Sequence, residues 1–407
     1  MNSCTYCGTY TIRIHSKSLT LLLAGILLLL LSGCSVKWTE AIRYGSVAQH
    51  EIKETVDIDI QKRLIILPVT LNGKEYRFLF DTGAPFSISG ELQEENNFKI
   101  ISKGKIVDSD KNKKQVDWAQ VDSVFVGDVL FLNQTAFIGD FEANPIMKCL
   151  EIDGIIGSNF IRHCNWMIDQ ENNTLSLLSS VDEQTNENGI AIPFNTDHQY
   201  NIFIDMNFGQ ARVKNILVDY GSNGSVALSN EIFTTLTNKS IIDTEFLESG
   251  IKQSGIIGES VELKRKLTFS DSVRIDDLAL KNVLIQTGET VSVGNQLLSR
   301  FQLTIDWNNK NLYLTTPEKE VNRIGLAGFR LGSSTDKGIY VQSVIEESNA
   351  YKSGIRPNMK VIKIDSLDFE NGNDFCDYVE YDLKDEIFMQ LIDSEGKKLD
   401  YYFNKTY

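Results

Sequence analysis

The chain is 407 residues long, 42% hydrophobic and 23% charged, so it can bury two or three packed cores and does not have the composition of a disordered protein. Its 55 acidic and 40 basic residues give a formal net charge of −15 at pH 7, which argues against nucleic acid as a partner. The four histidines are isolated in the sequence, and there is no zinc-type ligand cluster and no G-x-S-x-G turn. We therefore expect neither a metal ion nor a cofactor.

The N-terminus has the pattern of an export signal. Arg13 and Lys17 precede an apolar run at 19–31, which is shorter than the roughly 20 residues of a transmembrane helix and fits the central region of a signal peptide. The ending Leu-Ser-Gly-Cys resembles the lipobox of bacterial lipoproteins, which implies removal of residues 1–33 and lipidation of Cys34. An uncleaved anchor and an ordinary secretory signal are the alternatives. We expect a membrane-anchored protein of the bacterial cell envelope, on its periplasmic or outer face.

The rest of the chain is predicted to be mainly β and to divide into parts that differ in their sequence pattern. The polar residues 34–55 are predicted to be a tether, and two β-rich halves follow at 56–185 and 186–317. The C-terminal part, 318–407, has a different pattern. Short helices are expected near Glu91–Glu95 and Glu231–Leu236.

Each β-rich half is predicted to contain a hairpin whose second strand ends in an aspartate. The strand, turn and strand are 64–71, Asn72-Gly73 and 75–80 before Asp81, and 200–207, Phe208-Gly209 and 213–218 before Asp219.

The two aspartates open motifs that occur twice at nearly the same separation. Asp81-Thr82-Gly83-Ala84 is followed by Gly154-Ile155-Ile156-Gly157, and Asp219-Tyr220-Gly221-Ser222 is followed by Val293-Gly294-Asn295. Asp81 and Gly154 are 73 residues apart, and Asp219 and Gly294 are 75 apart. A repeat that keeps both motifs and their spacing indicates a duplicated unit. Two such halves would place two carboxylates face to face.

These segments resemble the aspartic proteases over about residues 56–317. The resemblance implies two β lobes, an Asp-Thr/Ser-Gly turn in each, and a later apolar strand ending in Gly that braces the turn. It further implies that Asp81 and Asp219 form a catalytic dyad, supported by the turn residues Thr82, Gly83, Ala84, Tyr220, Gly221 and Ser222. Two buried like charges cannot both ionise at close range, so the dyad would share one proton and activate a water without metal or cofactor.

The second motif departs from the family pattern at one position. Tyr220 stands where the family has Thr or Ser, whose small hydroxyl links the two turns, so the placement of Asp219 is open. We also hypothesise that Ser222 stabilises an ionised Asp219, whereas Ala84 offers Asp81 nothing equivalent and leaves it protonated. The resemblance further implies two hairpin flaps over the cleft, near 101–115 and 250–262.

After Pro317 the pattern resembles a PDZ domain over about residues 322–407. The glycine-rich stretch Gly325-Leu326-Ala327-Gly328-Phe329 precedes a strand, and Asn349-Ala350-Tyr351-Lys352-Ser353-Gly354-Ile355 begins with small residues as a short PDZ helix does. The resemblance implies capture of an extended peptide, with the backbone amides of Ala327, Gly328 and Phe329 at its terminal carboxylate. The alternative is a domain that packs against the β-rich halves and binds nothing.

The cysteines of the exported chain leave their pairing open. Cys149 and Cys164 flank the Gly154–Gly157 motif and are predicted either to form a disulfide or to remain as two buried thiols. Cys376 has no obvious partner.

The sequence thus predicts a lipid-anchored aspartic endopeptidase, monomeric, with polypeptide as its substrate and a PDZ-like domain that recruits it. The alternative is a catalytically inactive envelope protein that uses the same cleft to bind an extended peptide. Tyr220 favours this alternative, and the Asp-x-Gly retained in both halves favours the enzyme.

Overall fold

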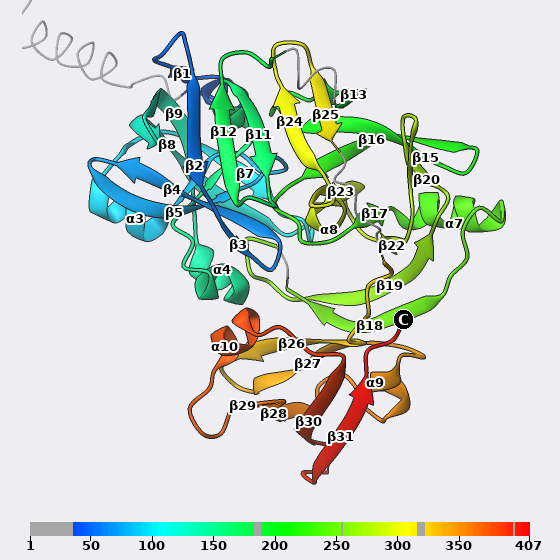
Figure 1. Ribbon diagram of the computed structural model, residues 1–407. Coiled ribbons are helices and arrows are strands. Elements are labelled where there is room, and N and C mark those ends of the chain that lie inside the picture. The colour runs from blue at the N-terminus through cyan, green and yellow to red at the C-terminus, as the bar shows by residue number, and fades with distance from the viewer. Residues whose placement is uncertain (1–35, 183–188, 254, 316–321, 394) are drawn as a thin grey trace, which may run out of the picture. The chain divides into compact units, whose positions relative to one another are not determined.

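A computed structural model describes residues 36–182, 189–253, 255–315, 322–393 and 395–407. The predicted signal peptide and Cys34 lie outside these residues. Within the described part, no helix is long and apolar enough to cross a membrane. The protein is mainly β and builds three sheets (Figure 1).

The first sheet contains the Asp81 hairpin and runs in the order β1-β9-β6-β10-β5-β4-β8-β7, with β3 beside β4. Its strands are β1 (Ser46–Val47), β3 (Asp59–Gln61), β4 (Leu64–Leu71), β5 (Lys74–Phe80), β6 (Ser87–Ser89), β7 (Lys99–Val107), β8 (Lys113–Val126), β9 (Val129–Gly139) and β10 (Gly154–Ile156).

The second sheet joins the two halves of the β-rich part, because β11 from the first half pairs with β24 from the second. Its order is β13-β25-β24-β11-β12-β2. Its strands are β2 (Lys53–Asp57), β11 (Asn165–Asp169), β12 (Thr174–Leu178), β13 (Ile190–Pro193), β24 (Gln302–Asp306) and β25 (Asn311–Thr315).

The third sheet carries the Asp219 hairpin and continues into the C-terminal part, because β18 pairs with β27. Its strands are β14 (Asn195–Thr196), β15 (Ile202–Phe208), β16 (Ala211–Asp219), β17 (Val226–Leu228), β18 (Phe246–Lys252), β19 (Val261–Ser270), β20 (Val273–Ile275), β21 (Leu278–Leu280), β22 (Val283–Thr287), β23 (Ser292–Gly294), β26 (Phe329–Ser334), β27 (Gly338–Ile345), β28 (Lys360–Ile364), β29 (Leu367–Asp368), β30 (Glu386–Ile392) and β31 (Lys398–Asn404).

The described helices are all short. They are α2 (Trp38–Ala41), α3 (Gly90–Asn96), the 3₁₀ turn η1 (Phe141–Ala143), α4 (Pro145–Cys149), α5 (Ser158–Ile161), α7 (Asn230–Asn238), α8 (Asn295–Leu298), α9 (Asn349–Lys352) and α10 (Phe375–Glu380). The two predicted helices are confirmed as α3 and α7, and in both a serine, Ser89 or Ser229, caps the first turn with its hydroxyl.

Both predicted hairpins are present. The first turns at Asn72-Gly73, where φ is 51° and 81°, the left-handed backbone that a two-residue hairpin turn requires. The second turns at Gly209, with φ 53°, so Phe208 belongs to β15 and not to the turn as predicted.

The predicted tether is folded from Lys37 onward: α2 is followed by β1, which pairs with β9 in the first sheet, and the last residues of the range begin β2 of the second sheet. The side chains of Ala41 and Ile42 are fully buried, and the Thr135 hydroxyl donates to the Ala41 carbonyl at 2.7 Å. Trp38 stacks on Trp118 with ring centroids 5.3 Å apart. A segment that reads as polar overall is therefore held by a few apolar residues.

A disulfide connects the first β-rich half to the C-terminal part. It joins Cys149 at the end of α4 to Cys376 in α10, and Cys164 is a buried free thiol. The predicted choice between a Cys149–Cys164 bridge and two free thiols was therefore wrong on both counts. Sequence spacing could not reveal the pairing, because the two bonded cysteines are 227 residues apart.

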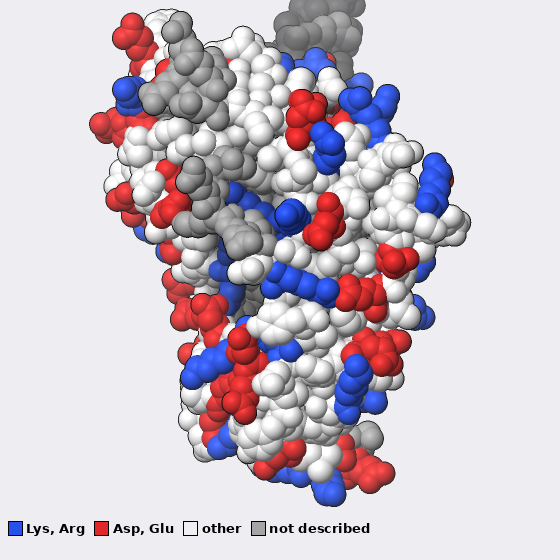
Figure 2. All heavy atoms as spheres, turned by 45° about the vertical axis from the view of Figure 1, so that its right-hand side comes forward, with Lys and Arg blue, Asp and Glu red and all other residues white. Residues whose placement is uncertain are grey.

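Charge is mixed over the face shown in Figure 2, where Lys and Arg side chains lie among Asp and Glu side chains. The net charge of −15 therefore does not produce a uniformly acidic surface on this face.

We predict that peptide mapping without reductant will recover a Cys149–Cys376 crosslink. Because this bond closes a long loop, reducing it should lower the free energy of unfolding by about 2–4 kcal/mol, measured by urea denaturation with and without dithiothreitol. Cys164→Ala, which leaves the bridge intact, is the control and should keep the response to dithiothreitol. A crosslink between Cys149 and Cys164 would contradict the structure.

Candidate active site

Asp81 and Asp219 follow strands that have equivalent neighbours. β5 runs parallel to β10, with Phe80 opposite Ile156, and β16 runs parallel to β23, with Asp219 opposite Gly294. The surrounding strand orders, β9-β6-β10-β5-β4 and β22-β17-β23-β16-β15, correspond strand by strand. Each aspartate therefore leaves the end of a strand in the middle of its sheet.

The predicted bracing glycines lie directly against the aspartate loops. A Cβ on Gly157 would be 2.1 Å from the Pro85 carbonyl carbon, and one on Gly294 would be 2.7 Å from the Ser222 carbonyl oxygen. These approaches let the amide of Ser158 donate to the Ala84 carbonyl at 2.7 Å. Glycine is needed at both positions because any side chain would displace the loop.

The Asn295 brace repeats this contact in the second half. Its amide donates to the Ser222 carbonyl at 2.8 Å, and its side-chain amide donates to the Tyr220 carbonyl at 2.8 Å. In the first half Ser158 has the place of Asn295, and the next residue, Asn159, accepts from the Phe86 amide at 2.7 Å with its side-chain oxygen. Sequence reasoning missed both asparagines, although each follows its bracing glycine by one or two residues.

The two aspartate loops are in direct contact. Thr82, fully buried, donates its hydroxyl hydrogen to the Val218 carbonyl at 2.5 Å and accepts from the Tyr220 amide at 3.1 Å. A Cβ on Gly83 would be 3.0 Å from Asp219 Cγ, and one on Gly221 would be 2.2 Å from Asp81 Oδ2. Each carboxylate therefore lies against the glycine of the other loop.

Backbone amides surround both carboxylates. The Gly83 amide donates to Asp81 Oδ1 at 2.7 Å, and the amides of Ala84 and Gly221 also bond Asp81. Asp219 receives the amides of Gly221 and Ser222. The Gly221 amide thus serves both acids.

Burial raises the pKa of both carboxyl groups. The pKa of Asp81 rises to about 6, with the amide bonds of Gly83, Ala84 and Gly221 opposing the effect of burial. The pKa of Asp219 rises to about 8, because the negative charge of Asp81 adds to burial. The pair therefore carries one proton over a range of pH, with Asp219 as the site that holds it more strongly.

The contacts of Ser222 differ from those in the hypothesis that its hydroxyl keeps Asp219 ionised. The Ser222 hydroxyl accepts from the Gly224 amide at 3.3 Å, and it is the amide of Ser222 that bonds Asp219. Ala84 gives Asp81 the same kind of amide bond, so the two positions do not differ in the expected way.

The Tyr220 ring does not separate the carboxylates. It is fully buried and packs edge-on against Phe80, with ring centroids 5.6 Å apart. Its hydroxyl has no hydrogen-bond partner among the described residues, and burial raises its pKa. Thr82 therefore makes the link between the loops from one side alone, without a second hydroxyl in return.

Both predicted flaps are hairpins, formed by β7–β8 and β18–β19, and their tips meet. Asp110 accepts from the Gly255 amide at 2.9 Å and pairs with Lys252 at 2.7 Å, while Asp108 accepts from the Ile257 amide at 3.3 Å. We call these contacts between Asp108, Asp110, Lys252, Gly255 and Ile257 the tip contact.

The glycines of the second hairpin allow close approach to its neighbours. A Cβ on Gly255 would be 2.0 Å from Asp108 Oδ2, and one on Gly258 would be 2.3 Å from the Ala143 carbonyl oxygen. Asn144 adds a bond from its side-chain amide to the Gly255 carbonyl at 3.1 Å. The sequence pattern did not identify the acidic tip residues Asp108 and Asp110.

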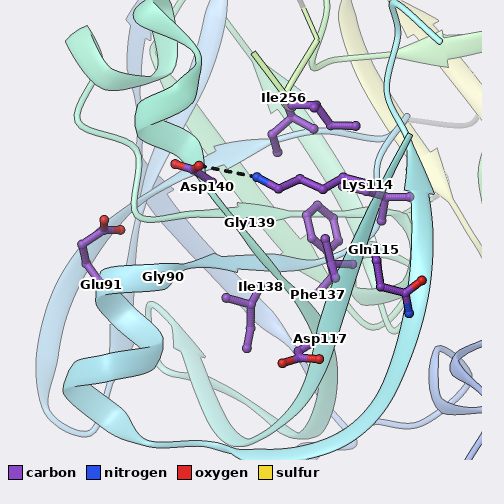
Figure 3. A pocket seen from close by; sticks show the side chains of 13 residues that line it. Gly90, Glu91, Lys114, Gln115, Asp117, Phe137, Ile138, Gly139, Asp140 and Ile256 are labelled. Atoms are coloured by element: carbon purple, nitrogen blue, oxygen red, sulfur yellow. Dashed lines mark hydrogen bonds and ion pairs between the residues drawn. The ribbon is translucent and has the colours of Figure 1, made fainter. Parts of the chain in front are cut away.

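A pocket of about 360 Å³ opens beside the tip contact (Figure 3). Phe137 and Ile138 of β9 and Ile256 of the second hairpin give it apolar walls, and Glu91 and Asp117 lie at its edges. Lys114 extends across it to Asp140 at 3.5 Å. Ile138 pairs with Ile88 of β6, two strands away from β5 and Asp81.

The loop 327–329 was expected to bind the carboxylate of a peptide. It is far from Asp81 and Asp219 in the sequence, and its residues contact the C-terminal part. Gly328 has φ 86°, and its carbonyl accepts from the Ile345 amide at 2.8 Å. Ala327 packs against the C-terminal core, and Phe329 is buried at the start of β26 against Phe403. No group of His, Cys, Asp and Glu suited to a metal ion occurs among the residues that the structure describes.

Comparison with known families gives one match, at residues 67–160, to a model described as Aspartyl protease. The matched segment contains the Asp81 loop and its Gly154–Gly157 brace and ends before Asp219. No curated protein matches the chain.

We predict that Tyr220→Phe will raise the free energy of unfolding by about 1 kcal/mol, because it removes a buried hydroxyl that lacks a partner. Urea denaturation measures this. Tyr76→Phe is the matched control, since the Tyr76 hydroxyl accepts from Asn96 at 3.4 Å and its removal should not stabilise. A destabilised Tyr220→Phe variant would show that the hydroxyl is bonded in solution.

Proposed function

We propose that the chain is an aspartic endopeptidase with Asp81 and Asp219 as its dyad. The observation that carries the proposal is the approach of the two loops, which sets each carboxylate against the other loop's glycine and raises both pKa values. The family match over residues 67–160 supports the peptidase chemistry of the first loop.

In the proposed reaction Asp81 is ionised and Asp219 is protonated. Asp81 takes a proton from water as the water oxygen attacks the peptide carbonyl carbon, and Asp219 gives its proton to the carbonyl oxygen. The resulting gem-diol collapses when the nitrogen takes the proton from Asp81 and the C–N bond breaks, while one gem-diol hydroxyl returns a proton to Asp219, leaving a carboxylic acid and an amine. Only water and the peptide are consumed, and the dyad returns to its starting protonation state.

The substrate in this proposal is an extended polypeptide held under the two hairpins. The pocket beside the tip contact would receive a large apolar side chain, because Phe137, Ile138 and Ile256 line it. The hairpin tips must part for the peptide to enter, since Asp110 and Lys252 join them.

The place of the protein and the role of its C-terminal part are further proposals. The lipobox-like ending at Cys34 supports a lipid anchor in the cell envelope. The PDZ-like region would capture polypeptide along β26, where Ala327, Gly328 and Phe329 lead into the strand. The amide of Leu331 in β26 is bonded to the Tyr378 side chain of α10, so a peptide would have to displace that contact.

A catalytically inactive peptide-binding protein is the second candidate. It is favoured by Tyr220, because the link between the aspartate loops has one hydroxyl where the family pattern has two.

We predict that the chain from Ser35 to Tyr407 will cleave members of a peptide library. Asp81→Asn and Asp219→Asn should each lower kcat/KM by at least about 10²-fold, because each removes one partner of the proton transfer. Asp205→Asn, which alters a half-buried carboxylate paired with Arg212, is the matched control and should cleave normally.

Two other outcomes of this experiment would contradict the proposal. Peptide binding without cleavage above the two variants would support the inactive binder. Loss of cleavage in Asp81→Asn alone would mean that the second half is a scaffold and that the active form needs another chain, against the expected monomer.

We also predict a bell-shaped dependence of kcat/KM on pH with its maximum near neutrality. The rate should fall as pH drops through about 6, where Asp81 takes up a proton and the base is lost, and as pH rises through about 8, where Asp219 loses its proton and the acid is lost. Steady-state kinetics from pH 3 to 10 measures this. An optimum near pH 3 would contradict the raised pKa values.

A further inference from the structure

The second hairpin is built into the sheet of the C-terminal part. β18 pairs with β19 on one edge and with β27 on the other, with Glu248 opposite Ile345 and Gly250 opposite Ser343. Gly250 has φ 145°, and a Cβ there would be 2.3 Å from the Gln342 carbonyl oxygen. Backbone pairing therefore joins the hairpin to the C-terminal part side by side.

One buried carboxylate lies in this junction. Glu248 is 2% exposed, and its Oε1 accepts from the Ser343 hydroxyl at 2.6 Å and lies 3.2 Å from Arg330 Nε. Arg265 Nε lies 2.8 Å from Oε2 as an ion pair. Ser343 and Arg330 belong to the C-terminal part and Arg265 to the hairpin, so Glu248 is held from both sides.

The contacts of Glu248 hold it in the charged form. Burial alone would raise its pKa, but the charges of Arg330 and Arg265 and the Ser343 hydroxyl outweigh burial, and the pKa lies below its usual value. A buried carboxylate that loses such partners is strongly destabilised, so its partners must stay in register around it.

Arg265 also bonds a residue that lies near the Asp219 loop. Arg265 donates from Nη1 to Gln286 Oε1 at 2.9 Å, in β22. The side-chain nitrogen of Gln286, Nε2, lies near Gly224, because a Cβ built on this glycine would be 3.5 Å from it. Gly224 in turn donates its amide to the Ser222 hydroxyl, in the loop of the second aspartate.

In the other direction β18 ends at Lys252, which is itself part of the tip contact. The angle at which β18 leaves the junction therefore decides whether the amides of Gly255 and Ile257 reach Asp110 and Asp108. Figure 1 shows the β18–β19 hairpin reaching from the C-terminal part toward α4.

We propose that Glu248 is a positioning residue that mounts the second hairpin on the C-terminal part and so holds its tip over the cleft. The C-terminal part then serves as the support of a substrate-covering element, in addition to any capture of polypeptide. The kinetic consequence rests on the proposed peptidase function, whereas the positioning itself does not.

The test is amide hydrogen exchange at Gly255 and Ile257 in the full chain, followed by NMR. Glu248→Gln keeps the shape and removes the charge, and Arg330→Gln removes one partner from the C-terminal side. Both should speed exchange at these two amides at least tenfold, because a misdirected hairpin opens the tip contact more often. Glu370→Gln is the control, because it breaks an exposed pair with Lys398 in the C-terminal part and should leave both amides unchanged.

Unchanged exchange at Gly255 and Ile257, with faster exchange confined to β26 and β27, would overturn the proposal, since Glu248 would then support only the C-terminal core. If Glu248→Gln does not fold, Arg330→Gln decides, because its side chain is 52% exposed and its loss is tolerated more easily.

Kinetic measurements test this proposal separately from the proposed peptidase function. With a cleaved peptide, Glu248→Gln should raise KM about tenfold and leave kcat within about twofold, because the hairpin holds substrate and the dyad is unchanged. A fall in kcat with KM unchanged would contradict positioning through the hairpin. If the wild-type chain cleaves nothing, the peptidase proposal fails, and the exchange data still decide the role of Glu248.

Discussion

The candidate site depends on the contact between two loops that have no room for side chains at their glycines. A Cβ on Gly221 would overlap Asp81, and one on Gly83 would be in tight contact with Asp219. Amide hydrogens, which are the donors left at such positions, then point at both carboxylates. The raised pKa values follow, because two acids held close together in a buried site cannot both be charged.

The surrounding sheets hold the two loops in that contact. Gly157 and Gly294 bring a neighbouring strand against each loop, and the six-stranded sheet joins the two halves through β11 and β24. Thr82 then closes the link with a hydroxyl that both donates and accepts. The two loops, each supported by its own sheet, are thus linked in one arrangement, although Tyr220 contributes only its backbone amide to the link.

Local patterns in the sequence predicted the local parts of this structure. The Asn72-Gly73 turn, the strands that deliver Asp81 and Asp219 and the serine-capped helices α3 and α7 each depend on a few consecutive residues. The bracing glycines could be found because the motifs occur twice. The family match at residues 67–160 ends before Asp219, so the pairing of Asp81 with Asp219 rested on the repeat.

The parts that could not be predicted depend on residues far apart in the chain. The pairing of β18 with β27 uses backbone groups, which leave no mark on side-chain composition. The tip contact needs Asp110 beside Lys252. The bond to Asp219 from the Ser222 amide, and not from its hydroxyl, depends on a loop geometry that sequence spacing does not reveal. Apolar residues such as Ile42 were hidden in a segment whose average character is polar.

The bond between Cys149 and Cys376 closes a covalent ring that contains the whole Asp219 half and most of the C-terminal part. A single cut in the backbone inside this ring leaves the two fragments joined through the disulfide. A nick in a surface loop of the ring therefore does not release the Asp219 loop from the half that carries Asp81.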